Sequence, residues 1–420
     1  MRRAAHSARM ANAAQSAIDA SHLWLPFTQM AGFDAAARTF VRGLGNDLID
    51  ARGHRTFDAI SSIWTTIHGH CHPAIVQRIA EQAASLDHAT LLGGVNPPAA
   101  ALAARLAELT GLERAFFSSD GASAVEVALK IALQYWQNTG EPERTRFVHL
   151  SDAYHGDTAA AMSVSDIAGF KERFHEVTFE ARRYDGSDEA IFGPDVAAII
   201  VEPIVQAAAG MRIVPAANYD RLKARGALLI VDEIATGFGR TGAMFAHQTL
   251  GLVPDIVCVG KGLTGGTLAL SATLVRETLY RAFLGTHAEQ KHLLHGHSYA
   301  GNPIACAAAL ASLDLFASEG TLAHATELAQ RLHPLLRDIA AHERVREVRQ
   351  AGLMCGIELE STNLSAGNAS TPAWHVADRL YDRGFFTRPI GNVIQLVPPL
   401  SSTHEELAAF CAALLDVLDS

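Results

Sequence analysis

Lys261 is the residue whose surroundings are best suited to chemistry on a small molecule. It lies in residues 259–266 (VGKGLTGG), directly after the apolar run 256–259, which predicts a buried strand. The chain has five lysines among 34 basic residues, so few amines are available for such a role. Desolvation at a strand end lowers the pKa of an amine and makes it a nucleophile. Lys261 is therefore the best-placed reactive amine.

Asp232 supplies an acid in a matching position. Residues 227–231 (ALLIV) predict a second buried strand, which runs into Asp232 and then into the glycine-rich residues 237–242. Strand carboxyl ends line the ligand crevice of an α/β sheet, so the amine and the acid are expected to meet there. Pyridoxal phosphate needs such a pair, because a lysine bonds its aldehyde and an acid keeps its pyridine nitrogen protonated.

Two nucleotide-binding patterns overlap these residues, and both lack their required context. Gly260, Gly262 and Gly265 match a dinucleotide fingerprint, which needs an acid about 20 positions on at the end of a second strand. Glu277 comes too early and follows no clear strand. Residues 229–233 resemble a Walker B strand, but the only Gly-Lys pair in the chain is followed by glycine instead of Ser or Thr. The pattern favours a pyridoxal lysine over nucleotide binding.

A helix that begins near Gly121 is a candidate phosphate site. Residues 116–130 (FFSSDGASAVEVALK) place a Gly/Ser turn before an amphipathic helix, whose N-terminus offers free N–H groups to an anion. An ordinary N-capped helix has the same composition, so that alternative stays open. After the strand predicted at 146–150, Tyr154 offers an aromatic ring to cover the cofactor, with His155 beside it.

Together these segments resemble the class III pyridoxal-phosphate aminotransferases of fold type I, from about residue 22 to the C-terminus. The resemblance rests on residues 22–30 (HLWLPFTQM), 132–136 (ALQYW), 154–158 (YHGDT), 202–206 (EPIVQ), 232–242, 261–271 and 295–303 (HGHSYAGNP).

The resemblance implies an α/β fold with a large pyridoxal-phosphate-binding domain and a smaller α+β domain. Strand and helix patterns alternate from about residue 71 to 310, as in a mostly parallel sheet covered by helices. We expect the large domain to span residues 71–319 and the small one to combine 21–70 with 320–420. Residues 1–20 are Ala- and Arg-rich, which predicts a disordered extension, with a transit peptide as the alternative.

The resemblance also assigns roles to individual positions. Lys261 resembles the lysine that bonds the cofactor, Asp232 the partner of the pyridine nitrogen, and Tyr154 the aromatic residue against the ring. Gly121 and Ala122 match the pair that holds the phosphate. Because the second member of that pair is usually Ser or Thr, we expect a neighbouring serine, Ser119 or Ser123, to supply the missing hydroxyl.

Further positions resemble residues of the partner subunit and of the substrate side. His297 and Ser298 match positions that reach the phosphate from the second subunit of a homodimer. Arg388 resembles the arginine that binds the substrate carboxylate through two hydrogen bonds. Substrate contacts are also implied for Phe27, Trp64 and Gly296.

The implied activity is that of the branch acting in biotin synthesis, which aminates 8-amino-7-oxononanoate to 7,8-diaminononanoate. The amino donor stays open between S-adenosylmethionine and lysine. At the positions that match Phe27 and Gln395, the family members that use adenosylmethionine carry tyrosine. At the position that matches Ile63, they carry tryptophan. Other class III enzymes, such as an ω-amino acid:pyruvate transaminase or a dialkylglycine decarboxylase, remain alternatives, as does a catalytically silent relative.

Composition fits a cytoplasmic enzyme. The chain has 420 residues, 49% of them hydrophobic, and can bury a large core. A net charge of -10 argues against nucleic-acid or anionic-membrane partners, and no apolar stretch reaches the length of a membrane helix. Five cysteines are scattered without a C-x-x-C pair, which suits a reducing compartment; they are residues 71, 258, 306, 355 and 411.

Two other groups of polar residues are less informative. His68, His70, Cys71 and His72 could suggest a metal site, as could the later histidines 292, 295 and 297. The first group lies too close in sequence for the usual spacing of metal ligands, so we expect no metal site. Glu202 and Gln206 follow the apolar run 197–201 and could face the cofactor or substrate, or only pair with an arginine.

Overall fold

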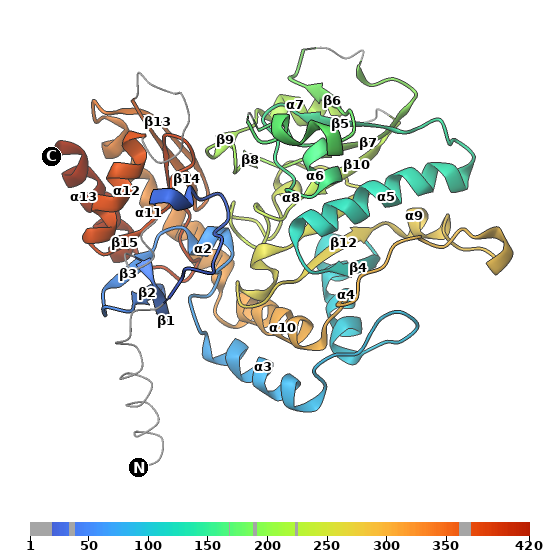
Figure 1. Ribbon diagram of the computed structural model, residues 1–420, viewed down its shortest axis with the longest axis horizontal. Helices are drawn as coiled ribbons and strands as arrows, with labels where there is room; N and C mark the ends of the chain where they lie inside the picture. Colours follow the sequence, from blue (N-terminus) through green and yellow to red (C-terminus); the bar gives the residue numbers. More distant parts are fainter. Residues whose placement is uncertain (1–18, 33–37, 168, 188–190, 223–225, 361–370) are drawn as a thin grey trace.

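The structure is a computed structural model. It describes the chain apart from residues 1–18, 33–37, 168, 188–190, 223–225 and 361–370 (Figure 1). The extension expected at residues 1–20 therefore lies outside the described residues, except for its last two.

A seven-stranded mixed sheet forms the centre of the molecule (Figure 1). All neighbouring pairs are parallel except the two that involve β12, which runs antiparallel to both of its neighbours. The expected mostly parallel sheet is thus confirmed. In spatial order the strands are β4 (Arg114–Ser118), β12 (Ser271–Val275), β11 (Ile256–Val259), β10 (Leu228–Asp232), β7 (Val196–Val201), β5 (Arg146–Leu150) and β6 (Arg182–Tyr184).

Both faces of this sheet are buried, which explains why its strands read as continuous apolar runs. In β10, Leu228 and Ile230 join a hydrophobic cluster with residues of α5 (Gly121–Thr139). Leu229 and Val231 join a second cluster on the other face, with residues of α4 (Pro97–Thr110) and α10 (Pro303–Ser318). This alternation follows from the two-residue period of a strand.

Shorter elements surround the sheet. The helices are α2 (Ser61–Trp64), α3 (Pro73–Ser85), α6 (Ala159–Ser163), α7 (Ala216–Leu222), α8 (Ala246–Thr249) and α9 (Glu277–Arg281). The 3-10 turns are η1 (Met30–Gly32), η3 (Glu172–Val177), η5 (Lys261–Thr264) and η6 (His287–Glu289), and β8 (Val205–Gln206) pairs with β9 (Arg212–Ile213).

The N-terminal strands and the C-terminal segment pack together beside the large sheet (Figure 1). Phe385 pairs with Phe57 in a four-stranded sheet, and a three-stranded sheet follows α11. The domain boundaries at residues 70 and 320 stay a prediction. The elements are β1 (Phe40–Leu44), β2 (Asp47–Asp50), β3 (Arg55–Asp58), α11 (Thr321–Ala340), β13 (Val345–Ala351), β14 (Met354–Leu359), α12 (Pro372–Asp382), β15 (Phe385–Phe386), β16 (Val393–Leu396) and α13 (His404–Asp419).

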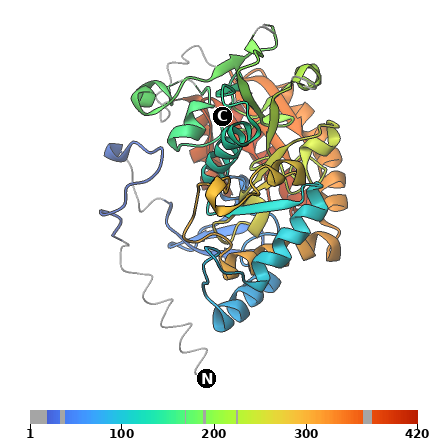
Figure 2. The same cartoon turned by 90° about the vertical axis from the view of Figure 1, so that its right-hand side faces the viewer.

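The described N-terminal residues 19–32 run along the outside of the molecule (Figure 2). Phe27 is held there by stacking on Phe170, with ring centroids 5.1 Å apart.

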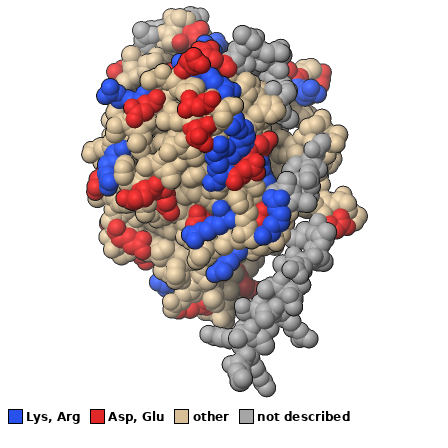
Figure 3. All heavy atoms as spheres, turned by 90° about the vertical axis from the view of Figure 1, so that its left-hand side faces the viewer, with Lys and Arg blue, Asp and Glu red and all other residues tan. Residues whose placement is uncertain are grey.

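Acidic and basic side chains are interspersed on the face formed by the C-terminal helices (Figure 3). Pairs such as Arg383 with Asp416 and Arg346 with Glu358 bridge neighbouring elements there.

Among the described residues, no single helix is long and apolar enough to cross a membrane. Only α10 and α11 taken together pass such a test, and they meet at a bend of 66°.

Candidate active site

A cavity of about 440 Å³ lies at the carboxyl ends of the central strands β5, β7, β10 and β11, against the N-terminus of α5. This is the position at which open α/β sheets bind ligands. Six of the predicted site residues line the cavity, whereas Phe27, Arg388, Gly296, His297 and Ser298 do not. The lining residues are Trp64, Asp120, Gly121, Ala122, Tyr154, His155, Gly156, Asp157, Thr158, Glu202, Asp232, Ile234, Ala235 and Lys261.

Lys261 lies at the start of η5, directly beyond β11, and lines this cavity. Its φ of 41° is unusual for a residue with a side chain. Burial lowers the pKa of the amine, with Asp232 and Glu202 acting in the opposite direction. The Nζ atom lies 5.0 Å from the centre of the Trp64 ring. The structure thus places a desolvated amine where the sequence predicted one.

Asp232 ends β10 and is 4% exposed. Its Oδ1 accepts the N–H of Ile234 at 3.0 Å, and its Oδ2 lies 2.7 Å from His155 Nδ1. A carboxylate only accepts hydrogen bonds, so this contact assigns the proton to Nδ1 of the imidazole. The sequence placed His155 near the cofactor but gave no sign of this pairing, because the two residues are 77 positions apart.

The N-terminus of α5 is built to receive an anion. Asp120 caps the helix by accepting the N–H of Ser123 at 2.9 Å, whereas the N–H groups of Gly121 and Ala122 have no acceptor within the described part of the chain. A Cβ atom on Gly121 would lie 2.9 Å from the Ile234 side chain, so a larger residue there would displace Ile234. These two amides are therefore available to a phosphate.

The two serines that could replace the missing hydroxyl of Ala122 are both held by the cap. Ser123 Oγ donates to Asp120 at 2.8 Å, and Ser119 Oγ donates to the same carboxylate at 3.1 Å. Ser119 Oγ also lies 3.0 Å from His297 Nε2. Their role toward a phosphate stays a prediction.

Tyr154 lines the cavity from the loop after β5. Its hydroxyl donates to Asp157 at 2.8 Å, and burial raises the pKa of the phenol. The ring meets Phe170 edge-on at 6.5 Å, and Phe170 in turn stacks on Phe27. Asp157, which the sequence reasoning did not single out, is the residue that fixes the Tyr154 ring.

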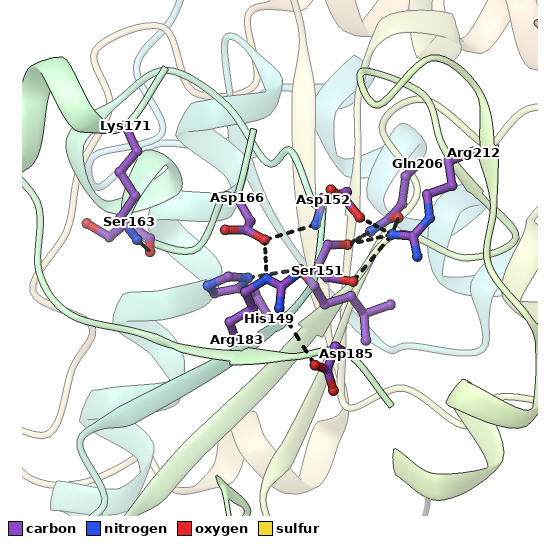
Figure 4. Close-up of polar contacts among 11 residues, drawn as sticks. His149, Ser151, Asp152, Ser163, Asp166, Lys171, Arg183, Asp185, Gln206 and Arg212 are labelled. Carbon is purple, nitrogen blue, oxygen red and sulfur yellow. Dashed lines mark hydrogen bonds and ion pairs between the residues drawn. The ribbon is translucent and has the colours of Figure 1, made fainter. Parts of the chain in front are cut away.

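A polar network holds this loop in place (Figure 4). Gln206 donates to the Ser151 carbonyl at 2.7 Å, and Arg212 contacts both Ser151 and Asp152. The N–H of Asp152, whose φ is 59°, donates to Asp166 at 3.1 Å. Gln206 therefore supports the loop that carries Tyr154 and does not line the cavity.

Trp64 reaches the cavity from a left-handed turn. Four consecutive non-glycine residues, Ser61 to Trp64, have φ values of 48° to 65°. Such residues cost about 1–2 kcal/mol each and are retained only where neighbouring contacts impose them. Buried Arg240 provides these contacts by donating to Ser61 Oγ at 3.2 Å and to the Thr66 carbonyl at 2.8 Å.

Gln395 connects Trp64 to Arg388. Its side-chain oxygen accepts the indole N–H of Trp64 at 2.8 Å, and its amide donates to the Arg388 carbonyl. The departure noted at Gln395 therefore lies beside the cavity wall, where it joins two of the predicted substrate residues.

Arg388 has no carboxylate partner among the residues that the structure describes. Its guanidinium lies 5.6 Å from the centre of the Trp374 ring and donates to the Phe27 carbonyl at 3.4 Å. Burial lowers the pKa of the guanidinium. A half-buried arginine without an internal anion is suited to bind a carboxylate from outside.

His297, Ser298 and Gly296 lie on a segment that contacts α5 of the same chain through Lys130 and Gln134. His297 contacts Ser119, while Ser298 and Gly296 are exposed. Their expected contacts with cofactor or substrate in a second subunit stay a prediction.

The histidine-rich segment forms separate hydrogen bonds. His68 lies against the Ser312 carbonyl at 3.0 Å and His70 against Asp58 at 2.9 Å. In the described ranges no group of three or more His, Cys, Asp and Glu side chains is arranged to hold a metal ion.

The cavity residues fit pyridoxal phosphate. Lys261 would supply the amine, Asp232, which accepts a hydrogen bond from His155, would supply the acid, and Gly121 and Ala122 present free amides for a phosphate. The close approach of Gly156 completes the cradle, because a Cβ atom there would lie 2.5 Å from Ala122 Cβ.

Comparisons with known proteins agree with this geometry. The family model described as "Aminotransferase class-III" matches residues 31–418. A curated relative from Anoxybacillus flavithermus, adenosylmethionine-8-amino-7-oxononanoate aminotransferase, is 39% identical over 430 residues, covering 95% of each chain.

Two solved structures share the fold. The crystal structure of adenosylmethionine-8-amino-7-oxononanoate aminotransferase from Methanocaldococcus jannaschii has a TM-score of 0.90 at 38% identity and covers 95% of this chain and 97% of that one. An amine transaminase from an uncultivated Pseudomonas species, solved in its PLP-bound form, has a TM-score of 0.86 at 32% identity, with coverages of 96% and 99%.

Proposed function

Because the chain belongs to the class III aminotransferases, we propose that it catalyses the amination of 8-amino-7-oxononanoate to 7,8-diaminononanoate in biotin synthesis. Its cofactor is pyridoxal 5'-phosphate. The observation that carries the proposal is that Lys261 and Asp232 line one cavity, and that Gln395 links the wall residue Trp64 to Arg388, a guanidinium without a carboxylate partner among the described residues. The acceptor has both a ketone to aminate and a distal carboxylate to bind.

The residues divide the work. Bound pyridoxal phosphate supplies an aldehyde and a ring that accepts electrons. Asp232 would keep a proton on the ring nitrogen, and the amides of Gly121 and Ala122 would hold the phosphate. Lys261 would anchor the cofactor through its amine, and the same amine is the group that would move a proton at the donor carbon. Arg388 binds the acceptor carboxylate and thereby orients the ketone.

The donor is either S-adenosylmethionine or lysine. Both present a primary amine on a cationic chain, and Asp157 is an acid close to the Tyr154 ring that could meet such a charge. The likeness to the Pseudomonas amine transaminase, together with Phe27, Ile63 and Gln395, keeps an ω-amine transaminase as the second candidate.

A homodimer with shared active sites and a cytoplasmic location complete the proposal. Apolar side chains of two neighbouring segments, Leu92, Val95, Leu294 and Tyr299, are 61–81% exposed, which supports a covered face. All five cysteines are free, as in a reducing compartment.

Product formation tests the proposal. The loaded enzyme is incubated with 8-amino-7-oxononanoate and with S-adenosylmethionine, lysine or β-alanine in turn, and 7,8-diaminononanoate is detected by mass spectrometry. We expect product with one of the first two donors. Product with neither, together with amination of pyruvate by β-alanine, would replace the proposal with the ω-transaminase.

Lys261→Ala tests the catalytic lysine in the same assay, with Lys291→Ala as its matched control. We expect the rate of Lys261→Ala to fall by a factor of about 10² to 10⁴ or more, because the variant lacks both the nucleophile and the proton carrier. Lys291→Ala removes a surface lysine that contacts Glu289 at 3.5 Å and should retain full activity.

A further inference from the structure

Glu202 is a buried carboxyl group in the cavity to which the mechanism above assigns no task. It directly follows β7, and the parallel pairing of Val201 with Val231 places it at the strand end beside Asp232. Glu202 is 4% exposed, and both acids line the cavity. Two carboxyl groups in one buried site do not both ionise readily, because each charge opposes the other.

The hydrogen bonds of Glu202 assign different tasks to its two oxygens. Oε2 accepts the N–H of Tyr154 at 3.0 Å, and the backbone carbonyl accepts the Tyr219 hydroxyl at 2.8 Å. Oε1 has no hydrogen-bond partner among the residues that the structure describes, and it is not sealed from the cavity. A proton on this carboxyl group would therefore sit on Oε1 and face the ligand.

The charges around Glu202 come from three neighbouring elements. Its pKa is raised from 4.5 to about 7, and burial is the largest cause. Asp232 at the end of β10 acts in the same direction, whereas His155 in the loop after β5 and Lys261 in η5 act to lower the pKa. The N–H of Tyr154 also favours the ionised form. Burial outweighs these opposing cations.

We propose that Glu202 holds a proton in the working enzyme and donates a hydrogen bond through Oε1 to an oxygen of the bound cofactor or substrate. Asp232 accepts a hydrogen bond from His155, whereas Glu202 keeps its proton beside it. The ligand therefore meets one carboxyl group that accepts hydrogen bonds and one that donates. The proposal rests on pyridoxal phosphate occupying this cavity.

Infrared spectroscopy tests the proton directly. The carbonyl stretch of a protonated carboxylic acid is recorded as a difference between the wild type and Glu202→Gln, first without cofactor and then with pyridoxal phosphate. The difference is needed because Asp255 is also buried with a raised pKa. We expect a band that belongs to Glu202 and disappears with a midpoint near pH 7. Its absence below that midpoint would overturn the proposal.

The ligand that accepts the hydrogen bond is identified by when the band moves. A shift to lower frequency on adding pyridoxal phosphate assigns the acceptor to the cofactor, and a shift only on adding 8-amino-7-oxononanoate assigns it to the substrate. A band that moves with neither ligand contradicts the donor role. The measurement with pyridoxal phosphate alone needs no turnover. It can therefore be interpreted even if the assignment to biotin synthesis is wrong.

Cofactor affinity gives a second readout. The amide introduced by Glu202→Gln would keep an acceptor for Tyr154 and a donor toward the cavity, so this variant should bind pyridoxal phosphate equally well on both sides of the midpoint. The wild type should bind it about tenfold more weakly well above the midpoint than well below it, the loss of one hydrogen bond. Equal pH dependence in both proteins would exclude the cofactor as the acceptor, and together with an infrared band that does not move with the substrate it would contradict the proposal.

Two controls complete the design. Glu319→Gln removes a surface carboxyl that contacts His72 and should keep the band and the pH dependence of the wild type. If Glu202→Gln does not fold, exchange into D₂O still shifts the band of a protonated carboxyl group in the wild type, and its midpoint is measured there.

Discussion

At the scale of single residues, burial changes the pKa values of the ionisable groups that line the active site. Lys261, Asp232 and Glu202 line one cavity, and burial moves the pKa of the amine down and that of Glu202 up. Both shifts favour the neutral forms, whereas Asp232 has a hydrogen-bonded partner in His155. The environment thus gives two similar acids different tasks.

Arg388→Ala should raise the KM for 8-amino-7-oxononanoate by about 10- to 100-fold, because a charge-assisted pair is lost. The rate of the donor half-reaction should stay unchanged when the donor is varied alone, and steady-state kinetics separate the two. Arg383→Ala is the control, since that arginine pairs with Asp416 on the surface. An unchanged KM would move the carboxylate site elsewhere.

Glu202 should also make folding stability depend on pH. Its pKa is about 7 in the folded protein and 4.5 as the ordinary value, so between these values the folded state binds more protons than the unfolded state. Stability from this group is therefore full below pH 4.5 and is lost as the pH rises toward 7, by at most about 1.4 kcal/mol per pH unit.

Chemical denaturation of the cofactor-free protein measures this effect. His68 and His149 have pKa values lowered by burial to about 4, so their contribution changes in the opposite direction, and only the difference between the wild type and Glu202→Gln isolates Glu202. We expect the variant to gain stability relative to the wild type across this window. A constant difference would mean that Glu202 does not titrate there.

At the scale of elements, the cavity is made where the loop after β5 meets the N-terminus of α5. Gly156 has a φ of 133°, and a Cβ atom on it would lie 2.5 Å from Ala122. Gly156→Ala should push the loop with Tyr154 away from the phosphate site and lower cofactor affinity by about tenfold or more, equivalent to about 1.4 kcal/mol.

Gly140→Ala is the matched control. Gly140 ends α5 with a φ of 89° and has open space around it. We expect it to lose about 1 kcal/mol of stability from backbone strain, with an unchanged dissociation constant for pyridoxal phosphate. Equal losses of affinity in both variants would show that the effect comes from stability alone.

The sequence predicted the elements of the sheet closely, because strands buried on both faces are continuous apolar runs. The strand expected at 227–231 spans Leu228–Asp232, and that at 256–259 was placed correctly. Lys261 and Asp232 could be found because each follows such a strand.

Contacts between loops could not be predicted in this way. The left-handed turn from Ser61 to Trp64 contains no glycine, so nothing in the sequence signals positive φ. It is imposed by buried Arg240 and by the Trp64–Gln395 hydrogen bond, whose partners are 331 residues apart. The tasks of Asp157, Gln206 and Glu202 emerged for the same reason only from the folded chain.

At the scale of the whole molecule, the described residues leave an apolar patch exposed to solvent, which Leu92, Val95, Leu294 and Tyr299 form. His88 and Tyr299 lie 5.0 Å apart and join the two segments that carry Leu92 and Leu294. We expect sedimentation velocity to give a homodimer.

Leu294→Asp should weaken that dimer and lower cofactor affinity together, since the partner subunit is expected to reach the phosphate. Leu23→Asp changes another exposed apolar residue and serves as the control. A monomer that retains full affinity for pyridoxal phosphate would contradict the shared site.

The most direct measurement is the absorbance of the cofactor in the purified, loaded enzyme during successive additions of donor and acceptor. We predict that S-adenosylmethionine or lysine removes the band of the Lys261-linked cofactor and that 8-amino-7-oxononanoate restores it. If neither donor changed the band, while β-alanine removed it and only pyruvate restored it, the assignment to biotin synthesis would be wrong.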